Sequence, residues 1–192
     1  MKNYYRIMLG KGSTESANCF AGGFVGVNFG IAQDLTGKLP DEWREFNREF
    51  IPVFLAARPD KTKIAAGLAC GSLWTIGKGI MSGDLVLSPD GNGRYRVGEI
   101  TGDYFYVPGP VLPHRRRVSW STRLIDRAEM SESLRNSAGS IGTIGSISGH
   151  RDEIEKLIGE SLTPTIVSTD STVEDPAAFA MEKHLEDFLV EN

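Results

Sequence analysis

The sequence predicts an α+β protein in which a small twisted β-barrel is flanked by helices. The first observation is a series of short β-branched and aromatic runs between residues 82 and 120, separated by turn signals such as Pro89-Asp90-Gly91. Such runs are typical of strands in a closed or nearly closed sheet. The second observation is a three- and four-residue spacing of large apolar side chains after Asp41, which predicts an amphipathic helix packed on the sheet.

The strands are predicted from short apolar runs bounded by Gly, Pro, Asp and Asn. Residues 85–87 end at a hairpin turn, after which residues 95–100 alternate in polarity, and Gly102-Asp103 signals another turn before residues 104–107. Residues 117–120 complete this series. The runs at residues 4–9 and 24–29 predict two earlier strands.

Helices are predicted where the apolar spacing changes from two to three or four residues. Asp41 after Pro40 suits a helix N-cap, and the helix that follows contains Pro52. Residues 61–76 combine large apolar and small side chains, which allows a second helix to approach the barrel closely. Further predicted helices comprise residues 123–134, 150–161 and 177–192, and the isoleucines at 141, 144 and 147 favour an ordered loop or a strand.

The composition is that of a water-soluble globular protein. Of 192 residues, 40% are hydrophobic and 24% are charged, and no apolar run approaches the ~20 residues that cross a bilayer. The first residues show no signal-peptide pattern, so we expect a cytoplasmic protein with no membrane partner. Cys19 and Cys70 lack the spacing of a zinc site or a disulfide framework, and buried thiols are expected.

Charge divides the chain into a basic body and an acidic tail. Residues 1–149 hold 18 Lys and Arg against 14 Asp and Glu, a net charge of +4, whereas residues 150–192 hold 3 against 11, a net charge of -8. A basic body is compatible with a polyanionic partner, but +4 is small for a dedicated electrostatic binder. If nucleic acid binds here, shape and a pocket must contribute.

Four motifs follow one another in the second half of the predicted barrel: GDLVL at residues 83–87, YRVGEI at 95–100, YFY at 104–106 and HRRRVSW at 114–120. Their order and spacing resemble the PUA-like superfamily that contains the EVE, YTH and ASCH domains, most of all the versions fused to modification-dependent restriction endonucleases. Upstream, residues 26–35 resemble the segment after the first strand, where an aromatic residue and an Asp recur. The resemblance covers roughly Tyr5 to Ile147.

A second resemblance concerns the end of the chain. Residues 181–192 resemble the opening helix of NucS-like and Mrr-like nuclease domains, and the sequence contains no PD-(D/E)XK motif. We therefore expect a base-reading domain at residues 1–149, a short helix and acidic linker at 150–176, and the first helix of a truncated nuclease domain at 177–192. No cofactor is expected in these residues, although the missing nuclease domain implies a divalent metal.

The sequence contains no constellation that suggests an active site or a metal site. The three histidines His114, His150 and His184 form no HxH or HExxH arrangement, and no Gly-x-Ser-x-Gly motif presents a nucleophile. We accordingly predict no catalytic residue here. Binding is the better interpretation.

The resemblance implies a pocket in which aromatic rings enclose one nucleobase. By position, Phe29 and Trp74 are the expected walls, with Tyr104 or Tyr106 as a third. Stacking on such rings contributes about 1–3 kcal/mol per base. Many relatives have Trp where this chain has Phe29, which offers less stacking area. Trp74 alone is equally compatible with a place in the core.

Two polar residues could read the edge of the base. Asp34 could accept a hydrogen bond from an exocyclic amine, although Asp in such a place also caps helices and turns. Asn28 could serve instead, because its amide both donates and accepts.

Phosphate contacts are expected from basic side chains near the predicted pocket. The densest basic run in the chain is at residues 115–117, where alternation along a strand should turn at least one side chain inward and one outward; a solvated charge run is the alternative. The expected phosphate-binding residues are Arg115, Arg116, Arg117, Lys11, Lys78 and Arg96, although Gly10-Lys11-Gly12-Ser13 could also be a plain turn without Walker spacing.

Together these observations predict a DNA-binding specificity domain that flips out a modified, methylated base and targets a nuclease to foreign DNA. An RNA-binding module that reads a single-stranded base is the first alternative. A protein-interaction or dimerisation domain that uses the apolar helix faces and the acidic tail is the second, and a homodimer could form through the full-length protein.

Overall fold

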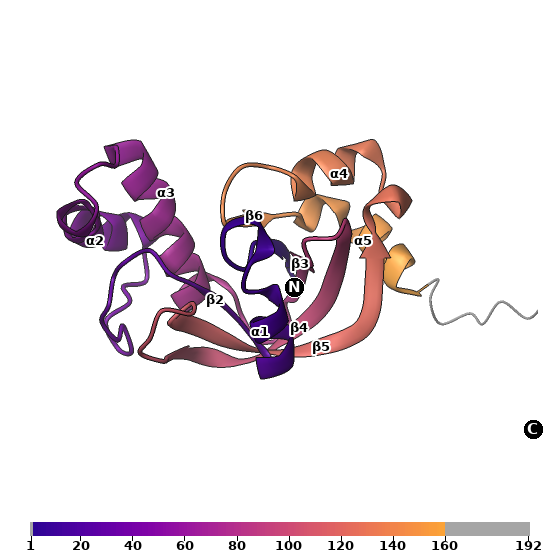
Figure 1. Cartoon of the computed structure of the whole chain (residues 1–192), viewed down its shortest axis with the longest axis horizontal. Helices are drawn as coiled ribbons and strands as arrows, with labels where there is room; N and C mark the ends of the chain where they lie inside the picture. Colours follow the sequence, from indigo (N-terminus) through magenta and orange to yellow (C-terminus); the bar gives the residue numbers. More distant parts are fainter. Residues whose placement is uncertain (1, 160–192) are drawn as a thin grey trace, which may run out of the picture. The chain divides into compact units, whose positions relative to one another are not determined.

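A computed structural model describes residues 2–159 and confirms the α+β class (Figure 1). The chain divides into two compact units, Met1–Leu157 and Ile158–Asn192, and the description below concerns the first. The predicted linker beyond residue 159 and the predicted helix at 177–192 lie outside the described residues.

One mixed sheet of six strands, in the order β2-β5-β4-β3-β1-β6, forms the centre of the fold. β1 (Tyr4–Ile7) pairs in parallel with β3 (Leu85–Pro89), and the other pairings are antiparallel. The outer strands β2 (Phe24–Val27) and β6 (Ile144–Ser146) do not pair with each other. The sheet is therefore open, which corrects the prediction of a barrel: strand signals in a sequence do not say whether the outermost strands meet.

The two longest strands form a hairpin that extends across the described part (Figure 1). β4 (Arg94–Tyr106) and β5 (His114–Asp126) contain 13 residues each. The turn predicted at Gly102-Asp103 is wrong, because these residues lie in an irregularity inside β4, where the register with β5 shifts. A bulge absorbs extra residues without ending the pairing. Residues 123–126, predicted as helix, extend β5 instead.

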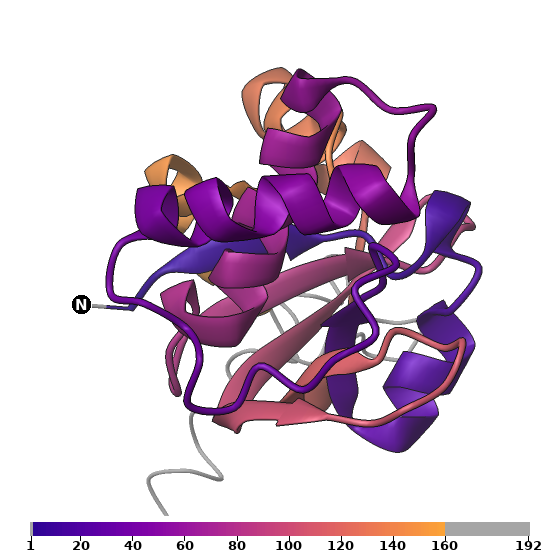
Figure 2. The ribbon, with the colours of Figure 1, turned by 90° about the vertical axis from the view of Figure 1, so that its left-hand side faces the viewer.

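Three helices lie between β1 and β3 in the sequence. α1 (Ser16–Gly22) was not predicted, whereas α2 (Trp43–Ala57) and α3 (Lys63–Trp74) confirm the predicted pair. α2 packs on α3 and crosses in front of it in Figure 2. The Thr62 hydroxyl caps α3 by accepting a hydrogen bond from the Ala65 N–H at 3.1 Å. α3 continues into a π-helical turn, η2 (Thr75–Gly79).

The last described elements follow β5. Besides β6, they are the 3-10 turn η3 (Arg127–Glu129), α4 (Glu132–Ala138), the 3-10 turn η4 (Ser148–His150) and α5 (Arg151–Gly159). α4 and α5 lie at the opposite end of the sheet from α2 and α3 (Figure 1). α5 confirms the short helix predicted after residue 150.

The core forms where the apolar faces of α2 and α3 meet the sheet. Phe46 and Phe50 of α2 stack with ring centroids 4.3 Å apart, and Cys19 and Cys70 are buried and unpaired, as expected. Burial raises the pKa of Cys19 to about 12 and that of Cys70 to about 11, so both thiols stay protonated. Among residues 2–159, no helix has the length and apolarity needed to cross a membrane.

Candidate functional site

A pocket of about 370 Å³ opens where β1 and β2 end, and we call it the Phe29 pocket. Its volume is at the lower end of the roughly 300–1,000 Å³ of small-molecule sites. Its lining includes three predicted site residues, Phe29, Asn28 and Lys11. The full lining is Met8, Gly10, Lys11, Gly26, Val27, Asn28, Phe29, Leu112, Gly142 and Thr143.

The Asn28 amide has a fixed orientation beside the half-buried ring of Phe29. Its Nδ2 donates to the Pro110 carbonyl at 3.0 Å, and its Oδ1 accepts from the Gly30 N–H at 3.0 Å. Each amide end therefore has one partner and retains capacity for a second hydrogen bond. Lys11 is exposed at the start of the 3-10 turn η1 (Lys11–Ser13).

Two glycines allow the backbone to shape this pocket. Gly10 has φ +77°, and a Cβ there would lie 2.6 Å from Thr14 Oγ1. At Gly26 a Cβ would lie 2.9 Å from the His114 carbonyl oxygen, so only glycine lets β2 approach β5 so closely. The loop between β4 and β5 adds Leu112, a buried non-glycine residue with φ +38°. Such strain persists only where surrounding contacts hold it.

Two arginines hold the walls of the Phe29 pocket by donating to backbone carbonyls. Arg115, expected to bind phosphate, donates to the carbonyls of Leu112 at 2.9 Å and Val111 at 2.7 Å, and its guanidinium stacks 4.0 Å from the centre of the Phe24 ring. Arg6, which the sequence analysis missed, is buried and donates to the carbonyls of residues 140 and 142. A lone Arg in the apolar run YYRIML was the available signal.

Arg116 is only 4% exposed, and its guanidinium binds backbone rather than solvent. It donates to the Ile76 carbonyl at 2.7 Å, the Gly77 carbonyl at 2.9 Å and the Gly102 carbonyl at 3.3 Å, which ties the π-helical turn η2 to the sheet. Burial lowers its pKa below the ordinary value. Its nitrogens already bind these carbonyls, and Nη1 also lies 3.9 Å from Asp103 Oδ1, so the structure does not present them to a phosphate.

The other three expected phosphate contacts have different surroundings. Arg117 is exposed and stacks over the Phe105 ring at 5.0 Å, and Arg96 stacks over the Phe20 ring at 4.7 Å. Lys78 forms an ion pair with Asp41. Arg117 is thus the member of the basic run that faces solvent, as strand alternation predicts.

Trp74 lines a different pocket from Phe29, so the structure does not bring these two rings together. Its Nε1 donates to the Pro40 carbonyl at 3.0 Å. The second pocket, about 380 Å³, lies between α2, α3 and β6 and is called the α2–α3 groove. It is lined by Trp43, Gly67, Leu68, Gly71, Ser72, Trp74, Thr75 and Ile144.

Tyr104, Tyr106 and Asp34 are not among the residues that line the Phe29 pocket. The Tyr104 hydroxyl lies 2.9 Å from His114 Nδ1 and accepts from the Leu35 N–H at 3.2 Å, and Tyr106 packs against the same imidazole at 5.2 Å. Burial raises the pKa of Tyr104 to about 12. Asp34 accepts hydrogen bonds from Thr36, which hold its pKa below the ordinary value; this is the turn role left open for it.

His114 is fully buried and joins two segments. Its Nε2 lies 2.7 Å from the Ile31 carbonyl, which can only accept, so Nε2 carries the proton and Nδ1 accepts from the Tyr104 hydroxyl. This pair anchors the segment that follows Phe29.

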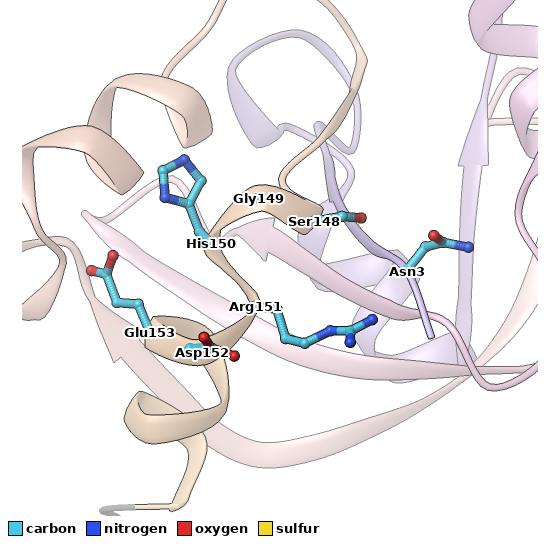
Figure 3. Close-up of a pocket in the computed structure, with 7 residues that line it drawn as sticks. All are labelled: Asn3, Ser148, Gly149, His150, Arg151, Asp152 and Glu153. Carbon is cyan, nitrogen blue, oxygen red and sulfur yellow. The ribbon is translucent and has the colours of Figure 1, made fainter. Parts of the chain in front are cut away.

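A third pocket, about 480 Å³, lies at the start of α5 (Figure 3). Its side chains already contact other elements: Arg151 donates to the Lys2 carbonyl at 2.7 Å, His150 Nε2 lies 2.9 Å from Ser137 Oγ, and Glu153 accepts from Ser131. Figure 3 shows Arg151 extending toward Asn3, away from His150. These contacts join α4, α5 and the residues just before β1. Among the described residues, no group of His, Cys, Asp or Glu is arranged to hold a metal ion.

The fold and the Phe29 pocket define an open-sheet α+β domain with a ligand-sized pocket where two strands end. The chain belongs to the family described as Domain of unknown function (DUF8426), whose model matches residues 5–148. No curated protein matches the chain.

Proposed function

We propose that this domain binds nucleic acid by accepting one nucleobase in the Phe29 pocket, and that its ligand is duplex DNA carrying a modified base. One observation carries the proposal: the consecutive residues Asn28 and Phe29, which supply an oriented amide and an aromatic ring, line one pocket together with Lys11 from a separate segment. In this proposal the domain directs a nuclease to foreign DNA.

Each of the three groups suits a different part of a nucleotide. The ring of Phe29 offers a face on which any base can stack. The Asn28 amide retains one donor and one acceptor site, which suits a base edge that presents both kinds of group. Lys11 is exposed beside them and can neutralise a neighbouring phosphate.

The apolar part of the lining supports a modified base in particular. Met8, Val27 and Leu112 contribute apolar side chains to the same pocket. A methyl group on the base would transfer from water onto this surface, and burial of one such group contributes about 0.8 kcal/mol. We therefore expect a methylated base to bind a few-fold more tightly than the unmodified one.

The experiment is a binding titration with short duplexes that are unmodified or contain N6-methyladenine, 5-methylcytosine or 5-hydroxymethylcytosine. Phe29→Leu preserves apolar bulk but removes the π face, so the loss of stacking, about 1–3 kcal/mol, predicts binding that is about 5-fold to 150-fold weaker. The matched control is Trp43→Leu in the α2–α3 groove, which should leave affinity unchanged. Equal affinity of Phe29→Leu and the parent protein for every duplex, or no binding at all, contradicts the proposal.

A single-stranded RNA ligand is the alternative within the same pocket, because reading an unpaired base requires no flipping. Competition between RNA and duplex DNA of matched sequence separates the two. A preference for RNA would support the Phe29 pocket as the binding site but refute duplex DNA as its ligand.

One observation favours a second function, which is protein interaction. Trp43 is 42% exposed and Leu68 is 67% exposed, and both line the α2–α3 groove. Large apolar side chains gathered at a groove often mark an interaction surface. If the groove joins two copies, sizing chromatography will show a dimer that Leu68→Ser dissociates, and Phe29→Leu will not.

A further inference from the structure

Ile141 is a large apolar residue that is fully exposed to solvent beside the Phe29 pocket. It lies in the loop between α4 and β6, immediately before Gly142 and Thr143, which line that pocket. A scattered exposed apolar residue needs no explanation. Ile141 does need an explanation, because it lies beside a pocket and its backbone is held in place.

One buried guanidinium holds the backbone on both sides of Ile141. Arg6 is 1% exposed; its Nη1 donates to the Gly142 carbonyl at 2.7 Å and its Nη2 donates to the Ser140 carbonyl. The N–H of Met8, the residue directly after β1, donates to the Thr143 carbonyl at 2.8 Å and fixes the same loop again. The exposure of Ile141 is therefore a property of an anchored loop.

We infer that Ile141 is a wedge that enters the base stack of duplex DNA when a base leaves the stack for the Phe29 pocket. The inference rests on the proposed function. Extrusion of a base leaves a gap between its neighbours, and an apolar side chain that fills it recovers part of the lost stacking. A β-branched side chain on a fixed backbone suits this role because it loses little conformational freedom on insertion.

If Ile141 is a wedge, its removal should affect the binding of duplex DNA but not of a single strand. A single strand has no duplex base stack, so a base that enters the pocket leaves no gap to fill. It should therefore bind equally well with or without the Ile141 side chain. A duplex should lose affinity when the wedge is removed. Ile141→Ser tests this, and the exposed Ile64 of α3, which lines neither pocket, provides the matched control Ile64→Ser.

The experiment measures fluorescence anisotropy with the full chain and with probes of one sequence: a duplex with a central N6-methyladenine, a duplex with a central 5-methylcytosine, and the modified strands alone. We expect Ile141→Ser to weaken binding of the preferred duplex on the order of tenfold and to leave the single strand unchanged. Ile64→Ser should change neither.

Four results would overturn the wedge. Duplex binding by Ile141→Ser equal to that of Ile64→Ser shows that nothing is inserted. Equal losses on duplex and single strand show that Ile141 contacts the bound nucleotide itself. If only the single strand binds, and Phe29→Leu weakens that binding, the wedge is refuted but the base-binding role of the pocket stands. If no probe binds, both the wedge and the base-binding role are refuted.

Discussion

Replacement of Arg116 by Lys should destabilise the domain far more than the same replacement at its neighbour Arg117. Arg116 makes three hydrogen bonds to carbonyls, at 2.7, 2.9 and 3.3 Å, inside the fold. A lysine ammonium has its donors on one nitrogen and cannot reproduce the planar fork that reaches three separate carbonyls, so we expect it to keep one of these bonds. Loss of two charge-assisted bonds at about 1.5–3 kcal/mol each predicts a cost of about 3–6 kcal/mol.

This cost is large beside the roughly 5–15 kcal/mol by which most native domains are stable. Urea unfolding followed by tryptophan fluorescence measures it, since the chain has three tryptophans. Arg117→Lys is the matched control, because Arg117 is exposed and such substitutions usually change stability by no more than about 0.5 kcal/mol. Equal unfolding midpoints for the two variants would refute the structural role of Arg116.

The same pair of residues separates structure from DNA contact. If Arg117 touches a phosphate, Arg117→Gln should lower the slope of log affinity against log salt by about one unit while the unfolding midpoint stays constant. An unchanged slope would remove Arg117 from the predicted interface.

Two further predictions concern stability. Burial lowers the pKa of His114 below about 6.5, so the neutral imidazole stabilises the fold at neutral pH, and this stabilisation is lost as pH falls from about 6.5 toward the lowered value. Urea titrations should show a larger loss of unfolding free energy between pH 7 and 5 for the parent protein than for His114→Gln. Parallel losses in the two proteins would contradict this. Gly98→Ala would place a Cβ 2.4 Å from Val118 Cγ1 and 2.6 Å from Trp120 Cε3, so we expect the unfolding free energy to fall by about 1–3 kcal/mol, measured by thermal unfolding. The control Gly71→Ala should not destabilise the domain, because a Cβ there meets nothing within 4 Å. Equal effects of the two substitutions would count against the packing argument.

The sequence predicted best the elements whose signals are local. The apolar spacing from Phe46 to Phe54 recurs over several turns, so α2 could be recognised despite Pro52. α1 is only 7 residues long, with Cys19 as its buried apolar side chain, which is too few positions for a period to appear. The closure of the sheet depends on strand edges far apart in the sequence, and no local pattern reports it.

The candidate site was predicted in part for the same reason. Asn28 and Phe29 lie at the end of the predicted strand at residues 24–29 and Lys11 follows the predicted strand at residues 4–9, so these residues could be nominated from chemistry and position. Trp74 has the same chemistry, but its place was set by the packing of α3 against the Pro40 segment. The partners of Arg116 are 39 and 40 residues away in a π-helical turn, which no sequence pattern announced.

Two arginines, the buried Arg6 and the half-buried Arg115, connect the fold to the site, because each fixes a loop that the Phe29 pocket uses. Arg6 fixes the loop before Thr143, and Arg115 fixes the loop that contains the strained Leu112. Walls held by the sheet before a ligand arrives do not have to be ordered on binding, and this saves the entropy that loop-built sites usually lose. Affinity should then depend on the contacts of Phe29 and Asn28 themselves, which is why single substitutions in this pocket are informative.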